Sequence, residues 1–377
     1  MSSAFFKKHW FLVGLVVLVG GGLSVGLMIP GEIVEKLEKR EGIGGALAAA
    51  PGWITRIVLF LMAFTLDSGK LRESVRFPLP VLWASLINAA AIPLAGLGLM
   101  RIQGDPSFEV GLMIACSVPC TLAAVSVWTR KAGGNDAVSL LITLMTNTLC
   151  FLVAPFWLNL ALADGEAQLP VDRMMERLLY VVLVPTLLGQ AVRMVPAARR
   201  IAVGHKPRIG IAAQGLILVL VFAAASLKAG PRLGEEGVAL GDVALVWACC
   251  LGLHLAAMVL GGAGARLMRF SREDRIAVLF GSSQKTLPIG VFLATSTEFG
   301  FGEAYPLAVF PMLMFHATQL FVDTIIADRI AASAPGEERP DPETDGPVRD
   351  SIDRTKWYVD ACAWVWYEGW AGHARED

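Results

Sequence analysis

The stretch that decides the fold is an apolar run, residues 276–297, whose polar middle reads Gly281-Ser282-Ser283-Gln284-Lys285-Thr286-Leu287-Pro288. A helix of about 20 apolar residues is long enough to span a membrane. Lys285 is the tenth residue of the run and would lie near the bilayer centre, where a lysine costs about 2.5–3.5 kcal/mol on insertion scales. A residue this costly indicates a functional site. The alternative is a structural pair with a carboxylate.

A second run carries the same feature. Residues 108–129 are apolar, and Pro119 lies in their middle as Pro288 lies in the first run. Proline removes one backbone hydrogen bond and clashes with the preceding turn, so both runs are predicted to form helices that unwind at the proline. Two interrupted helices at corresponding positions of two halves are typical of transporters that bind their substrate at the membrane midplane.

Composition places the rest of the chain in a membrane as well. Of 377 residues, 55% are hydrophobic and 17% are charged, against about 45–50% and 25% in soluble domains. The sequence predicts an all-α polytopic membrane protein with ten transmembrane helices, at about 9–29, 50–67, 79–100, 108–129, 137–162, 174–194, 208–228, 238–262, 276–297 and 304–327.

The ten runs divide into two similar halves. Corresponding runs start about 165 residues apart, as in the internal repeats of secondary transporters. Because five is odd, the second half must enter the membrane upside down. The fold class predicted is therefore two inverted five-helix repeats, in which broken helices 4 and 9 cross.

The basic residues between the runs indicate the orientation. Alternate loops hold 15 Lys and Arg on one side and seven on the other. Cytoplasmic loops carry the excess, so both termini are predicted to lie in the cytoplasm, with the protein in the inner or plasma membrane of the cell.

Charge also separates two domains. Residues 1–332 carry a net charge of +5 and are predicted to form the transmembrane domain, whereas residues 333–377 carry −6 and four of the ten tryptophans. This acidic, Trp-rich cytoplasmic tail is predicted to be disordered. The alternative is that its aromatic patch docks at the lipid headgroups, where Trp and Tyr are favoured.

Several classes of function are excluded. The net charge of −1, without a basic block, argues against a nucleic-acid binder. The chain has neither a P-loop nor a His-Glu-x-x-His motif. Its one Gly-x-Ser-x-Gly match, residues 22–26, lies inside the first run, where small residues favour helix packing over an enzyme's nucleophile elbow. Cys116 and Cys120, one turn apart, could suggest soft-metal transport, but packing is the preferred interpretation.

Three segments resemble the bile acid:sodium symporter family, and most closely its symporter-like (SBF-like) branch. They are Ser117-Val118-Pro119, Lys131-Ala132-Gly133-Gly134-Asn135 and Lys285-Thr286-Leu287. The resemblance covers about residues 1–330. It implies a core domain that holds the crossing helices, a panel domain, and transport of a small organic anion by alternating access, often together with sodium.

The resemblance carries over the family's sodium ligands only in part. The candidate remnants are Asn88, Thr143, Asn147, Ser283 and Gln284. Where the family has a glutamate that bridges both sodium sites, this chain has Phe280. Lys285 brings a fixed positive charge nearby, which would take the electrostatic role of the cation and repel sodium. No cofactor is expected, and sodium stays open as a coupling ion.

The sequence therefore predicts a midplane site at the two breaks, Pro119 and Pro288. Its substrate-binding candidates are Thr121, Ser126, Lys285, Thr286 and His316. One alternative function is a non-transporting membrane regulator of the same fold, with a protein partner for the tail. Another is a cation/proton antiporter of related fold. The antiporter is disfavoured because no Asp or Glu is expected in mid-span, Asp323 being placed near the end of its run.

Overall fold

The computed structural model describes residues 3–29, 31–40, 42–67, 78–163, 169–231, 233 and 237–333, and the regular secondary structure of these residues is all helical, without a strand. The predicted tail begins at residue 333, and from residue 334 onward it lies outside the described residues. The elements are α1 (Ser3–Met28), α2 (Gly31–Lys39), α3 (Ile43–Thr65), α5 (Pro78–Leu86), η1 (Ile87–Ala91), α6 (Ile92–Met100), α7 (Pro106–Ser117), α8 (Ala124–Lys131), α9 (Asp136–Ala161), α10 (Val171–Leu178), η2 (Leu179–Leu183), α11 (Val184–Met194), α12 (Pro196–Gly204), α13 (Lys206–Ala224), η3 (Ala225–Ala229), α15 (Leu240–Leu267), α16 (Arg272–Ser283), α17 (Leu287–Ala294), α18 (Phe301–Ala304) and α19 (Val309–Ala332).

Length and composition make this a polytopic membrane protein. Eight helices of the described part are long and apolar enough to cross a membrane, and two shorter apolar helices, Val13–Met28 and Pro106–Ser117, accompany them. Pro106–Ser117 is α7, the first half of the run that Pro119 interrupts. α7 ends at Ser117, and α8 begins only at Ala124. The other predicted interruption is also confirmed, since α16 ends at Ser283 and α17 begins at Leu287.

Several helix boundaries differ from the prediction, among them those of α3 and α19. The second run begins earlier, with α3 at Ile43, and the last helix, α19, extends from Val309 to Ala332 rather than from 304 to 327. The shift of α19 moves Asp323 from the end of a helix to its fifteenth residue. α2, a short amphipathic helix between two apolar ones, was not predicted.

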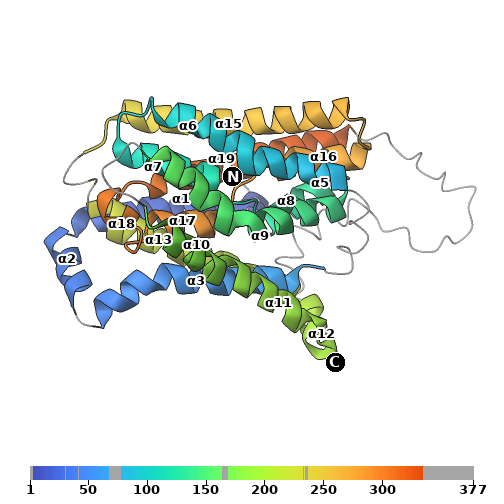
Figure 1. Ribbon diagram of the computed structural model, residues 1–377. Helices are drawn as coiled ribbons and strands as arrows, with labels where there is room; N and C mark the ends of the chain where they lie inside the picture. Colours follow the sequence, from blue (N-terminus) through green and yellow to red (C-terminus); the bar gives the residue numbers. More distant parts are fainter. Residues whose placement is uncertain are drawn as a thin grey trace, which may run out of the picture.

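The helices form two groups in contact (Figure 1). The crossing group consists of α5, η1, α6, α7, α8, α9, α15, α16, α17 and α19, and the outer group of α1, α3, α10, η2, α11, α13 and η3. In Figure 1, α15, α6 and α5 run along the upper side and α3, α10 and α11 along the lower side. The groups meet where α9 packs on α10 and where α17 packs on α3 and α13.

The two broken helices run in opposite directions. α8 contacts α16, and α7 contacts α17, so the second half of one helix lies beside the first half of the other. At the α8 end, Asn135 N donates to Glu273 O (2.9 Å) and Asn135 Nδ2 donates to Asp274 Oδ1 (2.8 Å). The loop after α8 and the start of α16 therefore lie at the same end of the bundle.

The Gly133-Gly134-Asn135 motif has a structural reason at this contact. Gly133 has φ +71°, a conformation that side chains with a Cβ rarely adopt. A Cβ on Gly134 would lie 2.6 Å from Ile276 Cγ2 of α16. Asn135 then caps α9 by accepting from the backbone N–H groups of Ala137 and Val138.

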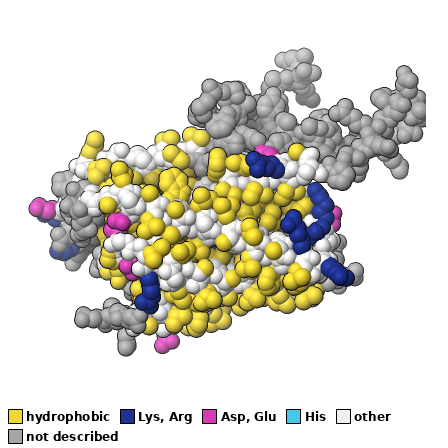
Figure 2. Space-filling view, turned by 90° about the horizontal axis from the view of Figure 1, so that it is seen from above, with side chains coloured by type: hydrophobic (Ala, Val, Ile, Leu, Met, Phe, Trp, Pro, Cys, Tyr) yellow, Lys and Arg dark blue, Asp and Glu magenta, His cyan; other side chains and the backbone are white. Residues whose placement is uncertain are grey.

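Charged side chains gather toward the two ends of the bundle, and the band between them is largely hydrophobic (Figure 2). This is the distribution expected of a protein whose middle faces lipid. The Gly-x-Ser-x-Gly match lies in α1, where a Cβ on Gly22 would approach Ala225 Cβ to 2.9 Å and one on Gly26 would approach Gly230 Cα to 2.7 Å. Its interpretation as small-residue helix packing is confirmed.

Candidate ion and substrate site at the two helix breaks

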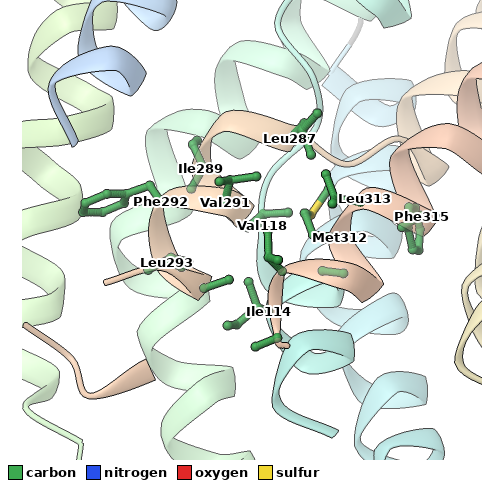
Figure 3. Packing of buried hydrophobic residues seen from close by; sticks show 14 of the residues in the cluster. Ile114, Val118, Leu287, Ile289, Val291, Phe292, Leu293, Met312, Leu313 and Phe315 are labelled. Atoms are coloured by element: carbon green, nitrogen blue, oxygen red, sulfur yellow. The ribbon is translucent and has the colours of Figure 1, made fainter. Parts of the chain in front are cut away.

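The two interruptions lie side by side inside the crossing group. Thr286 N, in the second break, donates to Pro119 O in the first (2.9 Å). Apolar side chains of α7, α17 and α19 pack closely around the crossing, among them Ile114, Val118, Leu287 and Met312 (Figure 3). The freed backbone groups of both breaks are thus shielded from lipid, and must find their partners within the protein.

Lys285 extends from the second break into the first. Its side chain is fully buried, and Nζ donates to Cys116 O (2.6 Å), Asn88 O (2.7 Å), Val118 O (2.9 Å) and Asn88 Oδ1 (3.2 Å). A shell of backbone carbonyl and amide oxygens is the coordination that hard cations receive in proteins. The lysine ammonium is thus held by oxygens of the same kind.

Asn88 belongs to this shell because its helix is distorted. It lies in η1, a π-helical segment between α5 and α6, and such segments often occur at functional sites. Pro93, shortly after it, has no N–H to offer the carbonyls of Asn88 and Ala89. Lys285 Nζ donates to Asn88 O instead, and Trp157 Nε1 donates to Ala89 O (2.8 Å). Asn88 Nδ2 in turn donates to Gln284 O (2.9 Å).

No carboxylate of the described residues forms an ion pair with Lys285, so the structural pair considered for it is not formed there. An ammonium group has three N–H donors, and the four oxygens around Nζ engage all of them. In this conformation all N–H donors of the Lys285 side chain are therefore engaged by oxygens of the protein itself.

Side chains of α9 hold the first break. Asn147 Nδ2 donates to Cys120 O (2.8 Å), Thr143 Oγ1 donates to Thr121 O (3.3 Å), and Thr146 Oγ1 accepts from Cys120 N (3.2 Å). Thr143, Thr146 and Asn147 therefore form one polar face of α9 against the break.

Side chains of α15 and α19 hold the second break. Gln319 Oε1 accepts from Lys285 N (2.8 Å) and its Nε2 donates to Lys285 O (2.9 Å). Gln284 Nε2 donates to Asp323 Oδ2 (2.7 Å). The His254 ring contacts Ser283 O through Nδ1 (3.3 Å) and Asp323 Oδ1 through Nε2 (3.1 Å). Asp323 and His254 are fully buried.

Asp323 corrects the sequence analysis. It was placed near the end of its span, and the expectation that no mid-span acid exists was wrong. The predicted run, 304–327, starts and ends before α19 does, which places Asp323 too close to the end of its helix. Neither His254 nor Gln319 was among the site candidates. Their spacing in sequence gives no sign that they meet at one break.

The remaining candidates are spread more widely. Ser126 bonds Ser139 between α8 and α9 (3.1 Å) and not a group of either break. Ser283 Oγ donates within its own helix. His316 Nδ1 accepts from Gln319 Nε2 (2.8 Å), one step removed from Lys285. Cys116 packs against Gly96, where a Cβ would lie 2.7 Å from Sγ, and no metal-holding group of His, Cys, Asp and Glu occurs among the described residues.

Two hollows adjoin the site. A narrow space, too small to admit a water molecule, touches the first break and is lined by Asn88, Ser117, Val118, Thr146, Cys150 and Val153, among others. An open apolar groove of about 450 Å³ lies between α9 and α10, and Val153 borders both. The groove lies where α9 of the crossing group packs on α10 of the outer group.

Paired helix breaks inside a polytopic membrane protein are typical of secondary transporters, and the family and relatives that match the chain are transporters rather than enzymes. The chain belongs to the SBF-like CPA transporter family, whose model matches residues 9–332.

Named relatives agree with that assignment. The chain is 29% identical to the uncharacterized protein PA2026 of Pseudomonas aeruginosa over 298 residues, which cover 76% of this chain and 87% of that protein. It is 27% identical to the probable sodium/metabolite cotransporter BASS4, chloroplastic, of Arabidopsis thaliana over 246 residues (61% and 54%). It is 21% identical to the sodium/bile acid cotransporter 7 of Danio rerio over 343 residues (88% and 96%).

Proposed function

We propose that the chain is a secondary transporter of a small organic anion in which Lys285 replaces a coupling cation. One observation carries the proposal: the ammonium lies at the helix breaks, buried and bonded to four oxygens of the kind that would bind sodium. The charge there is permanent on the protein and is not supplied by an ion from solution.

The membrane arrangement belongs to the proposal. Ten spans form two inverted repeats of five, α1 and the α7–α8 pair completing the eight long helices. The antiparallel contacts of α8 with α16 and of α7 with α17 support this arrangement. The excess of Lys and Arg on alternate loops supports cytoplasmic termini and insertion in the cell membrane.

Alternating access is proposed to be a movement of the crossing group, as core, against the outer group, as panel. The groove between α9 and α10 supports a substrate path at that boundary. Its apolar lining suits the hydrocarbon part of an organic anion, while the acidic part would lie toward the breaks. There Lys285 and the N-terminal ends of α8 and α17 supply positive potential.

The substrate class rests on charge and on relatives. Two relatives are named as cotransporters, one of sodium and a metabolite and the other of sodium and bile acid. The candidate contacts near the breaks are Thr121, Thr286 and His316, with Ser126 further along α8. Asn88, Thr143, Asn147, Ser283 and Gln284 are proposed to be remnants of sodium ligands.

Sodium itself is proposed to be dispensable. Two unit charges about 4 Å apart repel by about 4 kcal/mol at an effective dielectric constant near 20, which is roughly three decades in affinity. A sodium ion beside Lys285 would meet a repulsion of that order. The same oxygens cannot coordinate the ammonium and the ion at once.

The test is an uptake screen in proteoliposomes. The full chain is reconstituted and offered labelled anions that include taurocholate and small carboxylates, and protein-free liposomes serve as the blank. Saturable, protein-dependent accumulation of at least one anion is expected. Failure to accumulate any of the anions under any gradient contradicts the proposal.

A second arm separates transport from the regulatory alternative. Residues 334–377 are deleted, and flux is measured with the same anion. A transporter whose mechanism resides in residues 1–332 keeps its flux. Loss of flux in a deletion variant that inserts normally would favour a regulator that depends on its tail.

A further inference from the structure

Two short helices lie at opposite ends of the outer group, and they differ in charge. α2 (Gly31–Lys39) and α12 (Pro196–Gly204) have nine residues each, and both pack on α3. Figure 1 shows α2 at the left end of α3 and α12 at the right. α2 contains three glutamates and two lysines, whereas α12 contains two arginines and no acidic residue. The two ends of the outer group therefore present different charges to their surroundings.

The excess of positive charge extends beyond α12. Residues 177–234 contain no Asp or Glu. Arg199, Arg200 and Arg208 are exposed, and none of them forms an ion pair with a carboxylate of the described residues. Arg193, by contrast, is buried and bonded to the end of α3. The three exposed guanidinium groups are thus free to bind an anion outside the chain.

Exposed apolar side chains accompany these arginines. Four of them, in or directly before α12, are more than half exposed: Met194, Val195, Ile201 and Val203. Ile201 follows Arg199 by two residues, which turns an α-helix by about 200°, so the two side chains point to nearly opposite sides. A helix with basic side chains on one face and exposed apolar ones on another is typical of a segment that lies in the membrane interface.

The position of α12 in the chain keeps it at the membrane surface. It connects α11 to α13, and both belong to helices long and apolar enough to cross a membrane. Its Ala202 is fully buried, and α12 packs on α3, α11 and α13. Lys206, which follows α12, interacts electrostatically with Arg130 and Asp136. α12 therefore lies at the same end of the bundle as the loop between α8 and α9, the end that the proposed orientation places in the cytoplasm.

We propose that α12, with Arg199, Arg200 and Arg208, binds the headgroups of anionic phospholipids and places its exposed apolar side chains among the neighbouring acyl chains. Guanidinium groups match phosphate in charge and in geometry, and the cytoplasmic leaflet has a negative surface potential. α2, with its excess of glutamates, lacks this complementarity.

The consequence concerns the outer group. Because α12 packs on α3, α11 and α13, the bound lipid fixes the depth of that group in the membrane. The inference does not depend on what the protein transports, and its test needs no transport substrate.

The test compares two lipid environments. The full chain is placed in nanodiscs of phosphatidylcholine alone or of phosphatidylcholine mixed equally with phosphatidylglycerol, and amide hydrogen exchange of residues 196–208 is measured. Each arginine near an anionic surface contributes about fivefold in affinity, and exchange follows local stability. Exchange of this segment should therefore be at least about tenfold slower with phosphatidylglycerol. The difference should nearly vanish in about 1 M salt, where the Debye length is about 3 Å.

Matched variants assign the effect to the arginines. Arg199→Gln combined with Arg200→Gln keeps good helix formers and should lose most of the difference between the two lipids. Lys36→Gln combined with Lys39→Gln, on α2, should leave the response of residues 196–208 unchanged. Arg208→Gln, outside α12, should reduce the difference about fivefold, and it carries the prediction if the double arginine variant does not insert.

The acidic residues 334–377 are the other possible occupant of this surface. Deleting them should leave the effect of phosphatidylglycerol intact. Protection of residues 196–208 that is equal in both lipids and lost on this deletion would overturn the proposal in favour of the tail.

A second measurement counts the lipids directly. The protein is extracted with a copolymer from liposomes of equal phosphatidylglycerol and phosphatidylcholine content, and the lipids that remain with it are quantified. Phosphatidylglycerol should be enriched around the wild type and the α2 variant, and not around the double arginine variant. The same lipid ratio around all three proteins, or equal exchange of residues 196–208 in both lipids, contradicts the proposal.

Discussion

The two helix breaks differ in what they offer each other. The first, residues 118–123, presents carbonyl oxygens: Val118 and Pro119 accept from the second break, and Cys120 and Thr121 accept from α9. The second, residues 284–286, presents donors, namely Lys285 Nζ and Thr286 N. One break is rich in acceptors and the other in donors, so they satisfy each other inside lipid.

This difference explains why a lysine is tolerated at the membrane centre. Lys285 is surrounded by oxygens that the first break and η1 cannot satisfy within their own helices. Each break also retains a buried amide oxygen without a partner in the described part of the chain, Asn147 Oδ1 at the first and Gln284 Oε1 at the second. The crossing is therefore a nearly closed hydrogen-bonding system, and single substitutions test which break depends on which partner.

The largest effect is expected from Lys285→Met. The substitution leaves four buried oxygens without their donor, and an unsatisfied buried group costs about 1–3 kcal/mol. The free energy of unfolding in lipid nanodiscs should fall by at least about 3 kcal/mol. Uptake should be abolished or should come to need an external cation.

Two variants serve as controls for that substitution. Lys285→Arg keeps the charge but not the shape and should be only partly tolerated. Lys36→Met, on the exposed face of α2, should leave stability unchanged. A Lys285→Met protein as stable and as active as the wild type would mean that the ammonium does not hold the two breaks together.

Gln319→Ala should have the next largest effect on stability, and this effect should be confined to the second break. It removes both bonds to the backbone of Lys285 and should cost about 2–4 kcal/mol of unfolding free energy. The matched control is Gln214→Ala on α13, a half-buried glutamine whose amide oxygen is unbonded, with an expected loss below about 0.5 kcal/mol. Equal losses in the two variants would show that burial matters and the contact does not.

Asn147→Ala tests the first break and should cost less in stability, about 1–2 kcal/mol, because Thr143 and Thr146 still bond the break. Uptake should nevertheless fall strongly, as it should for Gln284→Ala at the second break. Reconstituted flux per inserted protein is the measurement. Full activity in both variants moves the site away from the breaks.

The smallest effects are expected from the prolines. The side chains of α9, α15 and α19 hold the breaks open, and Pro288 lies in the first turn of α17, where its missing N–H is not needed. Pro119→Ala and Pro288→Ala should each change stability by less than about 1 kcal/mol. A larger loss, measured by unfolding in nanodiscs, would show that the prolines themselves maintain the break.

The sequence predicted the parts of this site that are local. Pro119 and Pro288 interrupt apolar runs, and Lys285 lies within one of them, so each leaves a signal that a single run can show. The position of Asp323 within its helix was not predicted, because the hydropathy of a run does not fix the ends of the helix to within a few residues. Its pairing with His254 depends on how α15 packs against α19, and hydropathy along one helix carries no information about the rotation of its neighbour.

The central claim is that Lys285 takes the place of sodium at the crossing. The most direct measurement is initial uptake by wild-type proteoliposomes as sodium is replaced stepwise by choline at constant pH and osmolarity. The account predicts a rate that is independent of sodium, or nearly so. A rate that rises steeply with sodium and saturates at millimolar concentration would contradict it.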